Sequence, residues 1–199
     1  MPAKPQTANT EDNVTEFPHT ILVPYTYLRP GPESTGALAD YEGFTPIDDQ
    51  IASFHSKALE DRTFQDAFTE EVRTLDEFLA FLRDPTRFPV FGFQNLKVIG
   101  LGWLDNIAQH KAWGHFCFLK RAQNKLGVGL KTIDMWFSWR DADGQPTIDL
   151  LLGLIDVRLT KAIKFTISMG FNTVGTIPRV CDRSTPAILL YLENPNHGR

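Results

Sequence analysis

The chain has 199 residues, of which 42% are hydrophobic, 22% charged and 12% aromatic. This length and composition are typical of one globular domain and exclude a disordered or fibrous chain. The net charge of −4 argues against general binding to nucleic acid. The two cysteines, Cys117 and Cys181, make no disulfide framework, so we expect a reducing, cytoplasmic location.

The N-terminal region divides into a tail and a first strand. Residues 1–18 have no hydrophobic periodicity, and we expect a flexible tail there, followed by a single domain over residues 19–199. The run from Ile21 to Leu28 fits a strand that Pro24 confines to a sheet edge, and a turn-rich loop follows to about Thr45. The first residues lack the apolar stretch of a signal peptide, and no apolar run approaches the roughly 20 residues that a membrane span needs, so we expect no membrane partner.

A helical pattern follows, with apolar residues at helical spacing from about Asp48 to Asp84. Thr74 and Glu77 have the spacing of a capping box, in which each side chain binds a backbone N–H of the other residue. One helix is therefore expected to begin at this box. Pro85 is expected to end it.

The spacing then changes to that of strands. Residues 89–93 and 97–104 are expected to form an antiparallel hairpin. A polar loop is expected over residues 105–111, and a third strand over residues 112–119.

The segment after this third strand has the pattern of a phosphate site. It reads Asn124-Lys125-Leu126-Gly127-Val128-Gly129 and begins a helix expected to run to about Trp139. The unpaired N–H groups and the dipole of a helix start attract anions. Five basic residues and no acidic one lie between Lys111 and Lys131. The alternative is a tight turn at a helix start with a solvated basic surface.

The remaining pattern predicts a parallel crossover. An almost continuous apolar strand over residues 148–157 follows the glycine-opened helix. A second helix, with an apolar stripe from Leu159 to Ile167, is expected to end at Gly170 in a left-handed cap, and two strands close the chain. The expected architecture is a mixed α+β sandwich, with a central sheet of six to seven strands flanked by helices.

These motifs, in this order, resemble the GNAT superfamily of acyl-CoA-dependent N-acyltransferases over residues 48–192. Asn124 to Gly129 is similar to its pyrophosphate loop, and Gly170-Phe171 looks like the pair that ends its late helix. The resemblance implies acetyl-CoA or another acyl-CoA as co-substrate and a small-molecule or peptide amine as acceptor. It also allows a homodimer. No His or Cys group has the spacing of a metal site, so we expect no metal.

The resemblance also assigns cofactor contacts. It implies that the backbone of Phe118, Leu119 and Lys120 pairs with the pantetheine arm of the cofactor. It further implies that the pyrophosphate is bound by the N–H groups of Lys125, Leu126, Gly127, Val128, Gly129 and Leu130.

The catalytic groups are less completely matched. Trp113 stands where some members of the family carry a Glu base, so we predict His115 as the general base, because imidazole has an ordinary pKa near 6.5. The alternative is a histidine satisfied within the sheet. Thr166 falls where many members place a Tyr acid, although an alkanol is a much weaker acid than a phenol.

The competing prediction is a non-catalytic module that binds acyl-CoA or a protein partner. A domain without any cofactor would have side chains filling the cleft between the central strands.

Overall fold

The structure is a computed structural model that describes residues 20–25, 47–67, 72–95, 97–180 and 185–196. The tail expected over residues 1–18 lies outside the described residues, as does Cys181, and the single domain over residues 19–199 stays a prediction. The described strands are β1 (Thr20–Pro24), β2 (Phe88–Gln94), β3 (Lys97–Ala108), β4 (Lys111–Phe118), β5 (Leu150–Asp156), β6 (Asn172–Ile177) and β7 (Ala187–Glu193).

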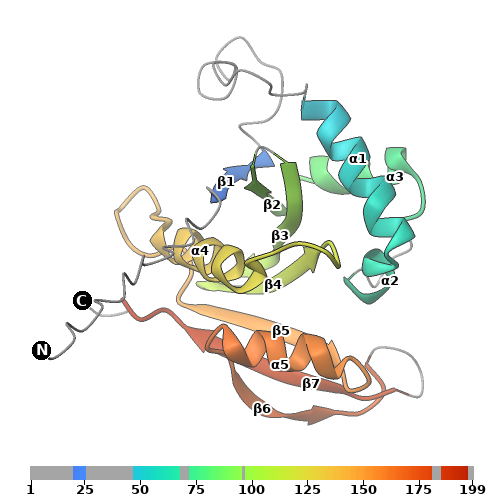
Figure 1. Cartoon of the computed structure of the whole chain (residues 1–199). Helices are drawn as coiled ribbons and strands as arrows, with labels where there is room; N and C mark the ends of the chain where they lie inside the picture. The colour runs from blue at the N-terminus through green and yellow to red at the C-terminus, as the bar shows by residue number, and fades with distance from the viewer. Residues whose placement is uncertain (1–19, 26–46, 68–71, 96, 181–184, 197–199) are drawn as a thin grey trace, which may run out of the picture.

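These strands form one sheet in the order β1-β2-β3-β4-β5-β7-β6 (Figure 1). Among the described strands, β4 and β5 form the one parallel pair, and the other neighbours are antiparallel. The sheet confirms the mixed α+β architecture expected from the sequence. It also places β1 at an edge, as Pro24 predicts.

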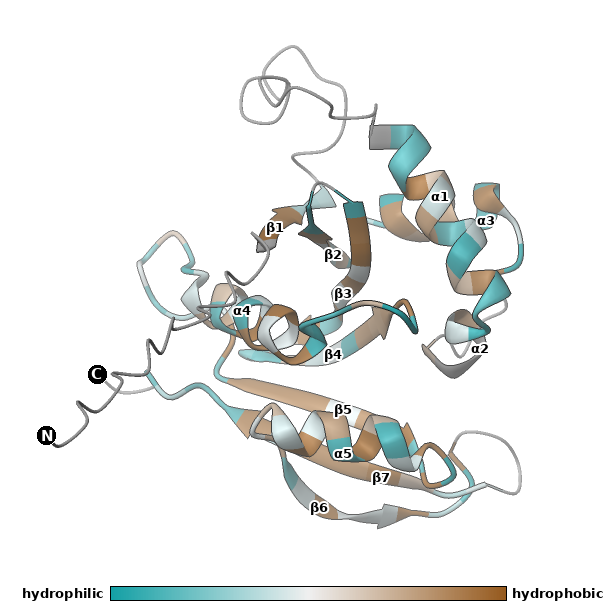
Figure 2. Cartoon of the chain, in the orientation of Figure 1, coloured by the Kyte–Doolittle hydropathy of each residue, from teal (hydrophilic) through white to brown (hydrophobic). Residues whose placement is uncertain are grey.

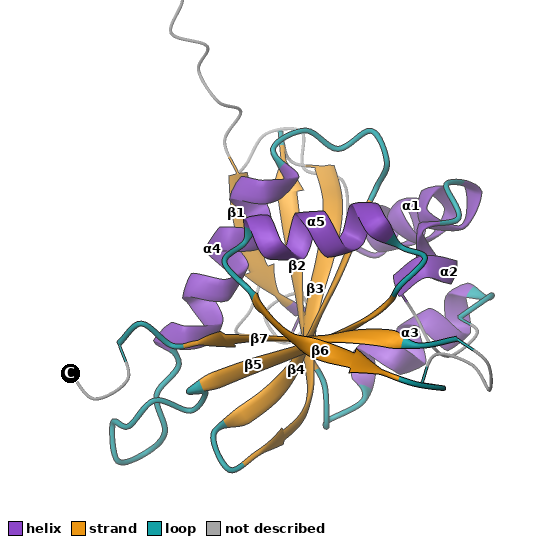
Figure 3. Cartoon of the chain, turned by 90° about the horizontal axis from the view of Figure 1, so that it is seen from below, coloured by secondary structure: helices purple, strands orange, loops and turns teal. Residues whose placement is uncertain are grey.

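The described helices flank this sheet; they are α1 (Ile47–Glu60), α2 (Thr63–Ala67), α3 (Leu75–Arg83), α4 (Lys125–Ser138) and α5 (Thr160–Ser168). Figure 3 shows α3 and α5 on opposite sides of the strands. The helix α3 begins at the expected capping box, since Thr74 and Glu77 bind each other's backbone N–H groups. Gly170 has a φ of +97°, which confirms the left-handed end of α5.

Two hydrophobic cores lie on the two faces of the sheet. The core under α1 and α3 contains Phe54, Phe78 and Cys117, and the core under α4 contains Trp136 and Leu151. In Figure 2, β5 is brown along almost its whole length, as its apolar sequence requires. Residues of β4 therefore alternate between two different environments, and this alternation decides which side chains reach each side of the sheet.

Two expectations for chain segments are wrong. The strand β3 continues to Ala108, where a loop from Asp105 was expected, because β4 turns back and pairs with the extra residues. Ile167, placed in the apolar stripe of α5, is 47% exposed, because the buried face of that helix runs through Thr166. The first of these differences brings Asp105 into the sheet.

The helix α4 approaches α5 closely at Gly129. A Cβ added to Gly129 would lie 2.5 Å from Sδ of the buried Met169, so the close approach depends on the missing side chain. We expect Gly129→Ala to lower the free energy of unfolding by about 1–3 kcal/mol through overpacking, measured by urea denaturation. Gly127→Ala is the matched control, since its Cβ would meet the exposed side chain of Asn124. Equal stability of Gly129→Ala and the wild type would contradict this packing.

His55 makes stability depend on pH. Its ring is 6% exposed and packs against the rings of Phe64 and Phe78. Burial lowers the pKa of His55, although the Glu77 charge and a hydrogen bond to the Thr74 backbone oppose this effect. The unfolded chain therefore binds the proton more readily. The contribution of His55 to the free energy of unfolding is fully present above the ordinary histidine pKa of about 6.5 and is lost as the pH falls below it.

The test compares the free energy of unfolding of the wild type and His55→Gln between about pH 7.5 and pH 5. The wild type is expected to lose more stability on acidification than the variant. His110→Gln, at an exposed position, is the control and keeps the wild-type dependence. A His55→Gln variant with the same pH dependence as the wild type would contradict the role of His55.

Candidate active site

The parallel pair opens part-way along its length. β4 and β5 pair at three positions, the last of which sets Trp113 opposite Leu152. Beyond that point β4 continues to Phe118 beside β3, and β5 continues to Asp156 beside β7 (Figure 1). The facing edges of the two strands therefore have no partner strand among the described residues.

Hydrogen-bond alternation along β4 decides which backbone groups face this opening. The N–H of Leu119 donates to the carbonyl oxygen of Ile99 at 3.0 Å, so Leu119 is bonded toward β3. Successive residues of an antiparallel strand alternate between their two sides, which directs the N–H and C=O groups of Phe116 and Phe118 toward β5. Phe118, one of the residues expected to pair with the pantetheine arm, thus faces the opening, and so does Phe116, whereas Leu119 is bonded to Ile99. The pantetheine contacts stay a prediction.

Hydrogen bonds hold the basic turn after β4 in place. The N–H of Lys120 donates to Oδ2 of Asp61 at 2.8 Å, and Nζ of Lys125 donates to the carbonyl oxygen of Lys120 at 2.9 Å. Burial lowers the pKa of Lys125, and the nearby Asp61 and Cys117 act in the opposite direction. Lys125 therefore closes the turn, while the side chains of Lys120 and Arg121 stay exposed.

The first turn of α4 presents free backbone donors. Asn124, the N-cap, is left-handed with φ 50° and ψ 33°, and its side chain makes no capping hydrogen bond. Val128 donates to the carbonyl oxygen of Asn124 at 3.1 Å, and later residues bond within the helix. The N–H groups of Lys125, Leu126 and Gly127 remain without an intrahelical acceptor. Of the residues from Lys125 to Leu130 that were expected to bind pyrophosphate, these three have N–H groups that the helix itself does not use, and the pyrophosphate contact stays a prediction.

His115 lies on the opposite face of the sheet from α4. Its ring stacks on Trp103, with centroids 4.8 Å apart and planes at 5°, and Trp103 belongs to the core under α1 and α3. It stands two residues beyond Trp113, where β4 and β5 part. Its Nε2 lies 3.3 Å from Oδ2 of Asp105. The two atoms are close enough for an ion pair, but the orientation of the ring does not give a hydrogen bond between them.

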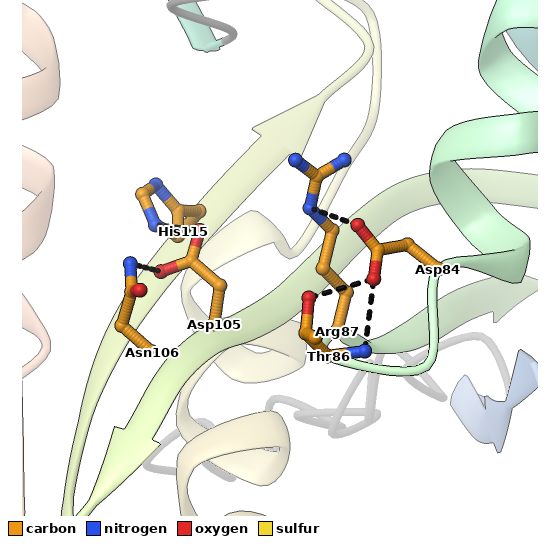
Figure 4. A network of polar contacts seen from close by, with 6 residues as sticks. All are labelled: Asp84, Thr86, Arg87, Asp105, Asn106 and His115. Atoms are coloured by element: carbon orange, nitrogen blue, oxygen red, sulfur yellow. Dashed lines mark hydrogen bonds and ion pairs between the residues drawn. The ribbon is translucent and has the colours of Figure 1, made fainter.

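Asp105 connects His115 to a wider polar group (Figure 4). Nδ2 of Asn106 donates to Oδ1 of Asp105 at 3.1 Å. Burial, the largest single influence, raises the pKa of Asp105, but the close approach and charge of His115, together with Asn106 and Arg87, more than offset it and lower the pKa below its ordinary value. Arg87 also lies 3.6 Å from Asp84. Asp105 is therefore an anion at neutral pH.

Sequence reasoning missed two members of this site, Phe116 and Asp105. Asp105 could have been found from the period-2 spacing of Trp103, Asp105 and Ile107, which continues the strand pattern. No local signal predicts which way the backbone N–H and C=O groups of Phe116 point, because their direction depends on the register between β4 and β3.

The expected acid, Thr166, lies in α5 (Thr160–Ser168). It is 9% exposed within α5. The neighbouring Phe165 is the α5 residue whose ring meets the end of β4, with its centroid 5.5 Å from that of Phe118. The assignment of Thr166 as an acid stays a prediction.

The described residues contain no group of three or more His, Cys, Asp or Glu side chains placed to hold a metal ion. Among the described helices, none is both long enough and apolar enough to cross a membrane.

No protein-family model matches the chain, and no curated protein matches its sequence. Solved structures do match. A spermidine N-acetyltransferase from Vibrio cholerae, in complex with CoA and spermine, superposes with a TM-score of 0.58 at 16% identity, over 73% of this chain and 90% of that one. A ribosomal-protein-S5-alanine acetyltransferase from Vibrio fischeri gives 0.59 at 15% identity, over 76% and 92%.

A third match is an acetyltransferase from Salmonella typhimurium that modifies the N-terminal serine of ribosomal protein L7/L12. It gives a TM-score of 0.59 at 9% identity, over 73% of this chain and 90% of that one. The chain has the GNAT fold. This fold confirms the architecture expected from the sequence, including the order β4, α4 and β5, in which Gly127 lies in the first turn of the helix. At these identities the superpositions show that the fold is shared, and the site is argued from this chain's own residues.

Proposed function

We propose that this protein transfers an acetyl or other acyl group from coenzyme A to a primary amine. The observation that carries the proposal is the opening between β4 and β5, where the backbone of Phe116 and Phe118 has no partner strand among the described residues, beside the open N-terminus of α4. Acetyltransferases of the same fold include one solved with CoA and spermine, which supports this assignment.

The residues at the opening fit an acyl-CoA. The N–H and C=O groups of Phe116 and Phe118 would pair with the amide groups of the pantetheine arm, as a strand would. The free N–H groups of the first turn of α4 would bind the pyrophosphate, with the helix dipole adding favourable potential. Lys120 and Arg121 would add positive charge at the exposed turn, and their contribution would weaken with salt.

The reaction requires a neutral amine at the thioester. A bound acyl-CoA would supply an activated thioester carbonyl to the amine, so that a C–N bond forms, the C–S bond breaks and CoA leaves as its thiolate. His115 would accept the proton that the amine loses, from the face of the sheet opposite α4. An unpaired N–H of β4 would stabilise the oxyanion. Holding both reactants in place would supply most of the remaining rate enhancement.

Departure of the thiolate does not require a strong general acid. A thiol has an ordinary pKa near 8.5, so its thiolate leaves without a strong acid and takes a proton afterwards. The buried position of Thr166 therefore does not prevent turnover. Whether Thr166 supplies the proton stays a prediction.

Calorimetry with acetyl-CoA and turnover with a panel of amines test the proposal. The panel contains spermidine, lysine and peptides with a free N-terminus, and release of CoA is followed with a thiol reagent. Binding together with amine-stimulated CoA release is the expected result. Absence of acetyl-CoA binding at high micromolar concentration would overturn the proposal.

A second candidate is a non-catalytic module that keeps the fold and binds acyl-CoA. It is favoured by Thr166, which has only a weakly acidic alkanol at the α5 position where the resemblance implies a Tyr acid, and by Trp113 at the position of a Glu base. Binding of acetyl-CoA without CoA release for any amine would support it. The cytoplasmic location and the homodimer stay predictions.

A further inference from the structure

The two ring nitrogens of His115 have different surroundings. Nε2 is enclosed by protein, although the side chain as a whole is 31% exposed. The exposed part of the ring therefore lies away from Nε2. Nδ1 is not among the enclosed, unpartnered polar atoms of the described residues and makes no hydrogen bond to them. Nδ1 is therefore the ring nitrogen on the side of the ring open to solvent.

Asp105 decides which nitrogen holds the proton. A neutral imidazole has one N–H and one lone pair, on different nitrogens. A lone pair on Nε2 would face the Asp105 carboxylate at 3.3 Å and be repelled, whereas an N–H at that position is attracted. The lowered pKa of Asp105 keeps this carboxylate charged at neutral pH. The favoured tautomer therefore has its proton on Nε2.

The partners of His115 come from one neighbouring strand, β3. Trp103 lies directly opposite His115 in the register, and its stacked indole fixes the plane of the imidazole. Asp105 follows two residues later on the same strand face and is held by Asn106 at 3.1 Å. A paired strand gives the carboxylate little freedom to move away. Two further charged residues of this surface are Arg87, which acts on Asp105, and Asp84, which pairs with Arg87.

We propose that Asp105 is a positioning residue that holds the proton on Nε2 of His115 and leaves Nδ1 as the nitrogen that accepts the proton of the acceptor amine. This inference rests on the proposed function. As the amine N–H bond breaks, its electron pair stays on the amine nitrogen and the proton bonds to Nδ1. The resulting imidazolium is stabilised by the Asp105 carboxylate.

Nitrogen-15 NMR of the imidazole rings tests the tautomer directly in the full-length protein. The His115 signals are assigned as those missing from His115→Gln. We expect the wild type to hold its proton on Nε2. Asp105→Asn is expected to shift the population toward Nδ1–H, because its amide can donate to Nε2. The same variant should lower kcat about a hundredfold, the lower range for a general base, with the Kd for acetyl-CoA unchanged.

Asp84→Asn is the matched control, because Asp84 belongs to the same polar surface but contacts Thr86 and Arg87, not His115. It should leave the tautomer and kcat at wild-type values. A wild-type Nδ1–H tautomer would overturn the proposal, and so would an Asp105→Asn variant with unchanged tautomer and kcat. If Asp105→Asn does not fold, the wild-type spectrum alone decides. If no amine is acetylated, the proposed function fails, and the tautomer is still measured.

Discussion

His115→Gln is expected to lower kcat for acetyl transfer by about 10²- to 10⁴-fold at neutral pH, the usual contribution of a general base. Glutamine keeps a polar side chain but takes up no proton. An aliphatic amine has a pKa near 10.4 and is almost fully charged at neutral pH, so loss of the base should reduce its reactive form at the thioester. The Kd for acetyl-CoA should be unchanged, because the cofactor contacts proposed here come from other residues.

The pH dependence separates this role from a structural one. Raising the pH from about 7 to about 9 deprotonates more of the free amine, so the ratio of wild-type to variant kcat should shrink. His110→Gln is the control, since His110 lies at the turn between β3 and β4, with Nδ1 2.9 Å from the Pro146 carbonyl oxygen. It should retain full activity. Equal kcat values for His115→Gln and the wild type would remove His115 from the mechanism.

Much of the fold follows from local signals in the sequence. The capping box at Thr74 fixes the start of α3, and the left-handed Gly170 fixes the end of α5. The apolar run of β5 marks a central strand, as Figure 2 illustrates. Each of these signals operates within a few residues of chain, so the local sequence is sufficient to read it.

The parts that sequence reasoning missed depend on pairing between distant residues, although the period-2 spacing around Asp105 is a partial local signal. Asp105 lies in a strand because β4 turns back to bind it, although its own sequence is polar enough for a loop. The backbone groups of Phe116 and Phe118 face the opening because Leu119 bonds to Ile99. A shift of one residue in that register would exchange the two edges of β4. The identity of the ligand-facing groups is therefore a tertiary property.

The glycine motif shows a further limit of sequence reasoning. Gly127 and Gly129 are two residues apart, and both were expected to bind pyrophosphate. In the structure Gly127 lies in the first turn of α4, under Asn124, whereas Gly129 lies against the buried Met169. The second glycine permits helix packing and has an N–H that is used within the helix. Of the two glycines, only Gly127 therefore has an N–H free for the pyrophosphate contact that we propose.

Gly127→Val is expected to weaken the binding of acetyl-CoA by roughly tenfold to a hundredfold, which corresponds to one lost charge-assisted hydrogen bond of about 1.5–3 kcal/mol. A Cβ at this position would lie 2.5 Å from Oδ1 of Asn124, so the two side chains would crowd the N–H groups that face the phosphates. Valine has a better helix propensity than glycine, which should preserve the folded state. Calorimetry with acetyl-CoA measures the change.

Two comparisons make this result specific to the phosphate site. Acetyl-pantetheine has no pyrophosphate, so it should bind Gly127→Val and the wild type equally. Gly175→Val places the same side chain on β6, where an added Cβ meets nothing within 4 Å, and should leave acetyl-CoA binding unchanged. Wild-type affinity for acetyl-CoA in Gly127→Val would mean that the first turn of α4 does not hold the pyrophosphate. Equal losses for both ligands would instead place the damage in the strand opening, since pairing with the pantetheine arm is the contact that they share.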